Sequence, residues 1–256
     1  MRIQEVIDAL ERFAPLPLQE SYDNAGLQIG LTEADVSGVL LCLDVTEEVL
    51  AEAVERGCNL VVSHHPLLFR GLKRISDQNL VARCTRYALK HDLAVYSAHT
   101  NLDNATDGVN FEIMKRLGGT FERFIEPKDG GGSGVVFTIP AEAPMDFLKR
   151  VKATFGVHTL MHNAGPDGKI RRVAVCGGAA DEFLDGALAL KCDAFLTGEM
   201  HYHVYFGHEK EIWIGVLGHY ESEQYTVQVM HRIIEKACPN LKIVETQLNT
   251  NAINYL

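Results

Sequence analysis

The sequence predicts an α/β fold made of two α/β domains, each with a mostly parallel central sheet flanked by helices. Short apolar runs alternate with amphipathic segments along the chain, and strands that alternate with helices of about 10–15 residues indicate βαβ units. The alternation is interrupted once, by the glycine-rich stretch 129–134, and then resumes. A chain of 256 residues has room for two domains of this kind.

The first half opens with an amphipathic helix, because apolar residues recur at helical spacing from Ile3 to Phe13 before Pro15 stops the pattern. A polar turn and a short apolar segment follow at 20–30. Thr46 is the expected N-cap of the next helix. In order, we expect strand 38–44, helix 46–57, strand 59–63, a helix around 77–91, strand 93–99 and helix 107–117.

The glycine run has no periodicity, so residues 121–134 are interpreted as a linker or flexible tip. A second α/β half then begins, with Pro144 in the favoured first turn of a helix. We expect a metal-binding domain of residues 1–125 plus 217–256, and a second domain of residues 126–216. The expected elements are strand 134–140, helix 144–155, strands near 157–162 and 171–177, helix 180–190, strand 193–198, helix 201–208, strand 211–218, helix 221–237 and strand 241–246.

Composition restricts the classes of partner. A formal net charge of −10 and a pI near 5.5 argue against a broad nucleic-acid or anionic-membrane surface, although a local basic pocket is compatible with them. No apolar run reaches the length of a membrane span, and the amphipathic start is unlike a signal peptide. Six scattered cysteines without a C-x-x-C pair are expected to be reduced, mostly buried thiols of a cytoplasmic protein.

Polar residues gather at the ends of the predicted strands. His64 and His65 follow strand 59–63, and His99 and Asp103 follow strand 93–99. His219 follows strand 211–218, with Glu223 one helical turn further on. Ligands of open α/β sheets bind outside the carboxyl ends of the strands, and residues i and i+4 share a helix face. We therefore expect these side chains to form a catalytic or ligand-binding site and not to serve packing.

Five of these residues make a mixed imidazole and carboxylate set, which suits two divalent ions about 3.5–4 Å apart better than one tetrahedral zinc ion. Neighbouring side chains of extended backbone point apart, so each of the adjacent histidines could serve a different ion. The donors do not distinguish Zn, Mn, Fe, Co or Ni. Taken alone, Asp103 could be a helix cap and Glu223 a solvated helix residue. The expected metal ligands are His64, His65, Asp103, His219 and Glu223.

Five motifs, in order along nearly the whole chain, resemble those of the NIF-three-like family, also called GTP cyclohydrolase I type 2 homologues or dinuclear metal centre proteins. They are SYDNAGLQIG (21–30), VVSHHPLLF (61–69), HTNLDNATDGVN (99–110), TGEMHYH (197–203) and GHYESE (218–223). The resemblance implies a two-domain α/β protein with two metal ions, often assembled as a ring-shaped homohexamer with the metals facing its interior.

The resemblance also implies which residues hold the metals. The family's metal-binding positions fall on the same five residues, two in SHHP, one in HTNLD and two in GHYESE. Larger members carry a domain inserted between the halves, whereas this chain has only the glycine-rich stretch there. A function that depends on the insertion is not expected here.

Other polar residues leave alternatives open. His99 is either a partner or proton shuttle near the metals, or a buried hydrogen-bonding histidine. Glu199, His201 and His203 are either substrate or acid/base groups, or a capped helix start. The glycine pair in CGGAADEF (176–183) is either a tight turn or an anion site.

Two functions from different classes follow. The first is a metal-dependent hydrolase of a nucleotide or a similar phosphorylated small molecule, with Glu223 and His99 as the expected catalytic groups. Two ions bridged by Glu223 or Asp103 would lower the pKa of a bound water toward about 7. GTP cyclohydrolase chemistry is what the family name suggests, and a phosphoesterase would use the same metals. The second is a non-catalytic metal-binding oligomeric scaffold, metal chaperone or regulator.

Overall fold

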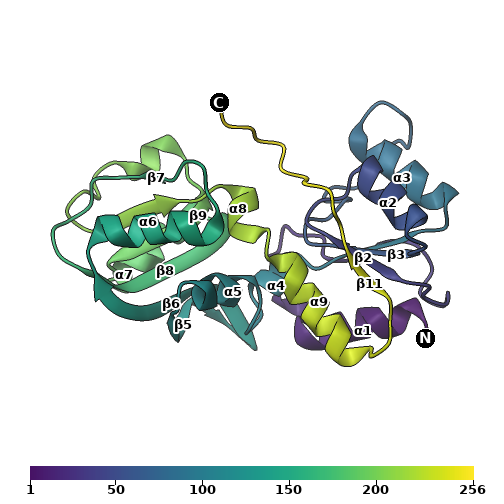
Figure 1. Cartoon of the computed structure of the whole chain (residues 1–256), viewed down its shortest axis with the longest axis horizontal. Coiled ribbons are helices and arrows are strands. Elements are labelled where there is room, and N and C mark those ends of the chain that lie inside the picture. The colour runs from purple at the N-terminus through teal and green to yellow at the C-terminus, as the bar shows by residue number, and fades with distance from the viewer. The chain divides into compact units, whose positions relative to one another are not determined.

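The computed structural model describes all residues, Met1–Leu256. The chain divides into two compact units, which we call the first unit (Met1–Leu102 with Thr226–Ala252) and the second unit (Asp103–Tyr225 with Ile253–Leu256). Each unit has one central sheet with helices on its faces (Figure 1). The predicted α/β class is therefore confirmed.

The sheet of the first unit has the strand order β1-β4-β3-β2-β11. The four strands from β4 to β11 run parallel, and β1 pairs antiparallel at the edge. Every residue of β2, β3 and β4 is buried, as expected for parallel strands covered on both faces. The bounds are β1 Gly26–Ile29, β2 Val39–Cys42, β3 Leu60–Ser63, β4 Ala94–Ser97 and β11 Ile243–Glu245.

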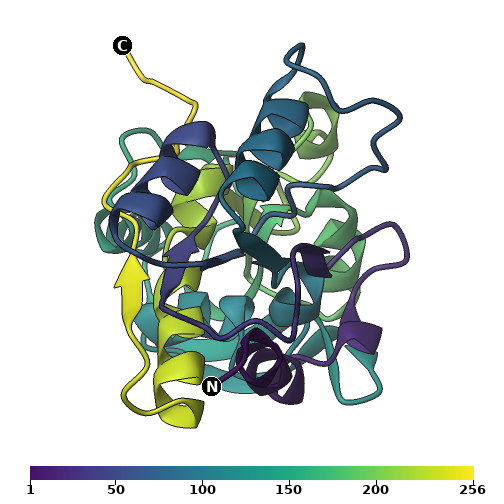
Figure 2. The same ribbon diagram turned by 90° about the vertical axis from the view of Figure 1, so that its right-hand side faces the viewer.

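Helices cover both faces of this sheet. α2 (Glu47–Glu55) and α3 (Leu80–Lys90) pack side by side on one face (Figures 1 and 2), and α1 (Ile3–Phe13) packs with α9 (Thr226–Ala237) on the other. A single 3₁₀ turn, η1 (Leu16–Leu18), follows α1. Thr46 caps α2 as predicted, since its hydroxyl accepts from Val49 N at 3.2 Å.

The sheet of the second unit is mixed, with the order β5-β6-β8-β9-β10-β7. Only β8, β9 and β10 run parallel, so "mostly parallel" describes the first sheet and not this one. The reason is topological: β5 and β6 form a long hairpin, and β7 pairs antiparallel with β10. The bounds are β5 Thr120–Lys128, β6 Gly131–Glu142, β7 Met161–His162, β8 Ile170–Ala179, β9 Ala194–Glu199 and β10 Trp213–Val216.

The glycine-rich stretch is this hairpin, and its interpretation as a linker or flexible tip was wrong. Asp129 and Gly130 form the turn, and Gly130 has φ +81°. A Cβ at Gly132 would lie 2.5 Å from Cγ of Phe124 on the paired strand, so the absence of a side chain lets the two strands pack. Tertiary packing here overrides the low strand propensity of glycine.

Helices again lie on both faces of the second sheet. α5 and α6 share one apolar core with Val135 and Val173, while α7 shares another with Val136 and Phe195. The segment expected as helix 201–208 contains only a 3₁₀ turn. The bounds are α4 Thr100–Asp103, α5 Val109–Arg116, α6 Pro144–Phe155, η2 Asp181–Phe183, α7 Leu184–Ala189, η3 Tyr202–Tyr205 and α8 His219–Glu223.

The helix expected at 221–237 is two helices, because α8 ends at Glu223 and α9 begins at Thr226. Gln224 between them donates to Phe155 O at 3.1 Å, and Tyr225 lies under the Arg116 guanidinium. These contacts hold residues 217–225 to the second unit. Residues 103–125, which we also expected in the first domain, belong to the second unit as well. Within it, α5 packs on β6 and β8, and β5 pairs with β6.

No helix of this fold combines the length and apolar character needed to cross a lipid bilayer.

Candidate metal-binding site

Three histidines meet at the carboxyl edge of the first sheet. His64 and His65 follow β3, and His99 follows the neighbouring parallel strand β4. Ring centroids are 4.9 Å apart for His64 and His65, 5.2 Å for His64 and His99, and 5.6 Å for His65 and His99. One ring nitrogen from each residue lies within 4.8 Å of the others. The first unit by itself therefore presents a cluster of three imidazoles.

The three rings differ in exposure. His64 is completely buried, whereas the side chains of His65 and His99 are 23% and 17% exposed. A small molecule or ion could thus reach the cluster from the side of His65 and His99.

Each ring of this cluster is oriented by an oxygen acceptor at Nδ1. His64 Nδ1 lies 2.8 Å from Ala98 O, and His65 Nδ1 lies 2.7 Å from Asp44 Oδ1. His99 Nδ1 lies 2.8 Å from Asp23 Oδ1. Metal-binding histidines almost always donate their second ring N–H in this way, which fixes the tautomer and the direction of the ring. Nε2 is accordingly the nitrogen of each ring that would coordinate a metal ion.

Asp23 is held as a carboxylate by its neighbours. Burial raises the pKa of Asp23, but hydrogen bonds from His99 and Thr100 outweigh burial and lower the pKa to about 2. Thr100 contributes its backbone N at 3.0 Å as well as its hydroxyl. Asp23 was not predicted as a site residue, although it lies in the motif SYDNAGLQIG. Its partner His99 is 76 positions away, so no local pattern could have paired them.

Asp44 was also missed. It follows β2, and β2 ends at the same sheet edge as β3 and β4, so its position at a strand end was the available signal. Burial raises the pKa of Asp44, and the hydrogen bond and charge of His65 reverse this, leaving the pKa below its usual value. Thr250 donates its hydroxyl to the other carboxylate oxygen at 2.7 Å.

The second unit carries its own histidine and carboxylate pair on α8. His219 Nε2 and Glu223 Oε2 are 3.2 Å apart, as expected for positions i and i+4. Glu199 at the end of β9 accepts from His219 Nδ1 at 2.8 Å, the same arrangement as in the first unit. The Glu223 side chain is only 4% exposed. Glu199 is thus placed to orient His219, a contact that the sequence could not specify.

Glycines make room for Glu223. Gly178 has φ +66°, and a Cβ there would lie 2.4 Å from Glu223 Oε1. The N–H of Gly177 donates to Asn110 Oδ1 at 2.9 Å, and that of Gly178 donates to Ser222 Oγ at 3.0 Å. Because both N–H groups have partners within the protein, the contacts favour the tight turn over the anion site.

Asp103 ends α4, and its backbone carbonyl accepts from Asn110 Nδ2 at 3.1 Å. Cys176 is buried, and its Sγ lies 4.0 Å from the same Asn110 Nδ2. Burial raises the pKa of the Cys176 thiol, and the charges of Asp103, Glu182 and Glu223 raise it further. Asp103 and Glu223 therefore act electrostatically on the same thiol within the second unit.

Of the remaining histidines, His201 is exposed and bonded to Asp181, with its Nδ1 2.5 Å from Asp181 Oδ2. His201, Asp181 and Glu199 line a small pocket of about 110 Å³. His203 contacts the rings of Tyr202 and Phe206 instead. The structure thus brings His201, but not His203, beside the carboxylate that orients His219.

The donors fit a divalent transition metal. Nitrogen and oxygen ligands without thiolate suit Zn, Mn, Fe, Co or Ni, and the Nδ1 contacts supply the outer hydrogen bonds such sites need. The five predicted ligands divide between the units: His64 and His65 belong to the first, and Asp103, His219 and Glu223 belong to the second. His99 joins the first set, as a neighbour of both histidines.

Comparison with known proteins identifies the family. Residues 1–252 match the family model Duf34/NIF3 (NGG1p interacting factor 3). A protein of Clostridium acetobutylicum named "GTP cyclohydrolase 1 type 2 homolog" is 32% identical over 250 residues, which cover 95% of this chain and 93% of the relative. NIF3-like protein 1 of Drosophila melanogaster is 32% identical over 210 residues, covering 79% and 70%.

Solved structures show the same fold. Hypothetical protein SA1388 of Staphylococcus aureus matches with a TM-score of 0.91 at 24% identity, covering 100% of this chain and 99% of that one. A Bacillus cereus protein related to NIF3 matches with a TM-score of 0.88 at 23% identity, with the same coverage. The sequence motifs, the two α/β units and these matches agree, and the chain belongs to the Duf34/NIF3 family.

Proposed function

We propose that this protein binds two divalent metal ions through His64, His65, Asp103, His219 and Glu223, and that it is a metal-dependent hydrolase of a nucleotide or a related phosphorylated small molecule. Membership of the Duf34/NIF3 family supports the proposal. So do the candidate groups of histidines and carboxylates that each unit contributes.

The observation that carries the proposal is the hydrogen bonding of Nδ1 in the candidate histidines. Four histidines in two different units, His64, His65, His99 and His219, each have Nδ1 bonded to an oxygen acceptor at 2.7–2.8 Å. Three of the four acceptors are carboxylates. Such contacts raise the basicity of the other nitrogen and orient it. His231 has one as well, but His64, His65 and His99 also lie together, and His219 lies beside the buried Glu223.

The ions, when bound, would supply a Lewis acid that lowers the pKa of water toward about 7 and polarises the bond under attack. His99, whose ring is held by Asp23, would move a proton at Nε2. Glu223, almost completely buried next to His219, would serve both as a ligand and as the catalytic carboxylate. Asp44 would hold the His65 ring, and Glu199 the His219 ring, in the orientation that directs Nε2 to a metal ion.

The substrate class rests on chemistry and on the relatives' names. Several relatives at about 32% identity are named GTP cyclohydrolase 1 type 2 homolog, and we carry this to the present chain as a proposal. Two closely spaced divalent ions also suit the hydrolysis of phosphoesters. GTP and a generic phosphoester are therefore the first substrates to test.

The deciding experiment measures bound metal by elemental analysis after loading with Zn, Mn, Fe, Co or Ni in separate samples. We expect about two ions per chain in the parent, and a loss of at least one in His64→Ala and in Glu223→Ala. His231→Ala is the matched control, because His231 also has Nδ1 bonded to a carboxylate, that of Glu245 at 2.7 Å, but is absent from the candidate metal groups. Full metal content in both site variants would contradict the assignment.

Turnover is tested on the same samples with GTP and p-nitrophenyl phosphate. Activity of the loaded parent that is lost in His99→Ala, with the metal retained, would support the hydrolase. Bound metal without turnover would instead favour a non-catalytic scaffold, metal chaperone or regulator.

We further propose that the chain assembles as a homohexamer. Light scattering at micromolar concentration should then give about six times the chain mass of 28.4 kDa. A mass equal to one chain would contradict this.

A further inference from the structure

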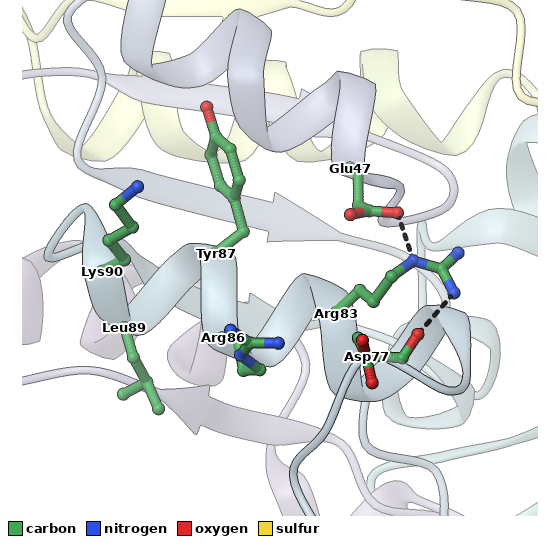
Figure 3. A pocket seen from close by; sticks show the side chains of 7 residues that line it. All are labelled: Glu47, Asp77, Arg83, Arg86, Tyr87, Leu89 and Lys90. Atoms are coloured by element: carbon green, nitrogen blue, oxygen red, sulfur yellow. Dashed lines mark hydrogen bonds and ion pairs between the residues drawn. The ribbon is translucent and has the colours of Figure 1, made fainter.

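A second pocket lies on α3 of the first unit, and its lining includes none of the clustered histidines His64, His65 and His99. It has a volume of about 420 Å³, within the roughly 300–1,000 Å³ typical of small-molecule sites. Neither the candidate metal ligands nor the carboxylates that orient them line it. The lining residues are Glu47, Asp77, Arg83, Arg86, Tyr87, Leu89 and Lys90 (Figure 3).

The cations of this pocket differ in their partners. Arg83 already has partners within the protein, since its Nε donates to Glu47 Oε2 at 2.7 Å and its Nη1 donates to Asp77 O at 3.4 Å. Arg86 and Lys90 are exposed and have no hydrogen-bond or ion-pair partner. They stand four residues apart on one helix face, where like charges repel. An anion between them would relieve that repulsion.

The charge of the surrounding segment points the same way. Residues 70–90 contain six lysines and arginines and one carboxylate, in a chain whose net charge is −10. Three of these cations, Arg70, Lys73 and Arg74, precede Asp77 by three to seven positions. A local concentration of positive charge in an acidic protein attracts anionic ligands.

The two ends of the pocket differ in the charged groups that line them. Glu47, Asp77 and Arg83 lie at one end and Lys90 at the other, with Arg86 and Tyr87 between them (Figure 3). Arg83 and Lys90 are seven residues apart, which is about 10 Å along a helix. A ligand that fits is therefore elongated, with an anionic group near Arg86 and Lys90 and hydrogen-bond donors at the end where Glu47 and Asp77 lie.

The middle of the pocket offers an aromatic surface. The half-buried Tyr87 ring is stacked on His91, with centroids 4.3 Å apart and planes at 29°. This stacking limits the motion of Tyr87. A planar ring of a ligand could pack against it, as bases do on aromatic side chains.

We propose that this pocket on α3 binds a phosphate-bearing small molecule with a planar base, of the nucleoside monophosphate class. The phosphate contacts Arg86 and Lys90, the base packs against Tyr87, and Glu47 and Asp77 accept hydrogen bonds from sugar or base donors. This site is separate from the proposed metal centre and needs no metal.

The test is calorimetric titration with AMP, adenosine and inorganic phosphate on the full chain after metal removal with EDTA. We expect AMP to bind at least tenfold more tightly than either fragment, and more weakly as salt is raised. Arg86→Gln combined with Lys90→Gln should weaken AMP binding at least tenfold. Lys152→Gln combined with Lys169→Gln, which removes two exposed cations of the second unit, should change it less than twofold.

Two further variants separate this site from the metal centre. Tyr87→Leu should weaken AMP binding while leaving phosphate binding unchanged, and Glu223→Gln should leave AMP binding unchanged. AMP binding that needs added metal, or that is lost in Glu223→Gln, would assign the nucleotide to the metal centre and overturn the proposal. So would a dissociation constant for the Arg86 and Lys90 double variant within twofold of the parent, or no binding at 1 mM AMP.

Discussion

Asp44 Oδ1 lies 2.7 Å from His65 Nδ1, joining the loop after β2 to the loop after β3. Thr250 donates to the second oxygen of the same carboxylate. The pKa of Asp44 is below its usual value, since the interaction with His65 outweighs the effect of burial. Asp44 is therefore ionised at neutral pH and fixes both the ring orientation and the tautomer of His65.

We expect Asp44→Ala to weaken metal binding about 10–100-fold, because loss of a carboxylate that orients a metal-binding histidine typically has this effect. Competition with a chromogenic chelator measures the affinity. Asp185→Ala, which removes an exposed carboxylate of the second unit, should leave the affinity unchanged. An unchanged affinity in Asp44→Ala would mean that His65 does not bind metal through Nε2.

Gly178→Ala should destabilise the second unit by about 3 kcal/mol, combining the cost of a left-handed conformation with a severe contact. The new Cβ would lie 2.4 Å from Glu223 Oε1, so metal content should fall too. Gly156→Ala is the matched control: Gly156 has φ +65° but nothing within 4 Å of its Cβ position, and should cost only about 1 kcal/mol. Urea denaturation measures both, and equal losses would contradict the steric account.

His201 should titrate above the ordinary histidine pKa of 6.5. The hydrogen bond that His201 Nδ1 donates to the Asp181 carboxylate, followed by the charge of that carboxylate, raises the pKa of His201, because the pair stabilises the imidazolium. Any stability from the pair is therefore present below about pH 6.5 and is lost as pH rises through the raised pKa. NMR titration of the His201 ring protons should show this, and Asp181→Asn should lower the value. An unchanged pKa in Asp181→Asn would contradict it.

The six cysteines should resist alkylation in the folded protein. All are buried and unpaired in disulfides, and burial raises the pKa of Cys84 and of Cys192 to about 11. At pH 8 only about one such thiol in a thousand is ionised. A thiol-reactive dye should report six fast thiols in guanidinium chloride and none on the same timescale without it. A thiol that reacts quickly in the native protein would contradict this prediction and would show that the fold opens around that cysteine.

Local signals predicted much of the fold. Thr46 and Pro144 begin their helices as expected, and the parallel strands of the first sheet follow from their apolar runs. The β5–β6 hairpin was not predicted, since glycines such as Gly132 carry no strand signal and are explained only by packing against Phe124. The break between α8 and α9 depends on contacts of Gln224 and Tyr225 with distant residues.

The candidate site was predicted in part. Strand ends placed His64, His65 and His99 together, because neighbouring parallel strands share an edge, and helical spacing placed His219 beside Glu223. The carboxylates that orient the rings could not be assigned. Asp23 and His99 are 76 positions apart, and Glu199 and His219 are 20 apart, so only the folded chain shows which carboxylate serves which histidine.

The missing side chain at Gly178 links two positions that are distant in the sequence. As long as position 223 is a glutamate with Oε1 where it now lies, position 178 has neither the space nor the backbone conformation for an ordinary side chain. A homologue that lengthens residue 178 would have to shorten residue 223 or move α8. A glycine at this turn is thus a sequence marker by which relatives that keep the Glu223 geometry could be told from those that have lost it.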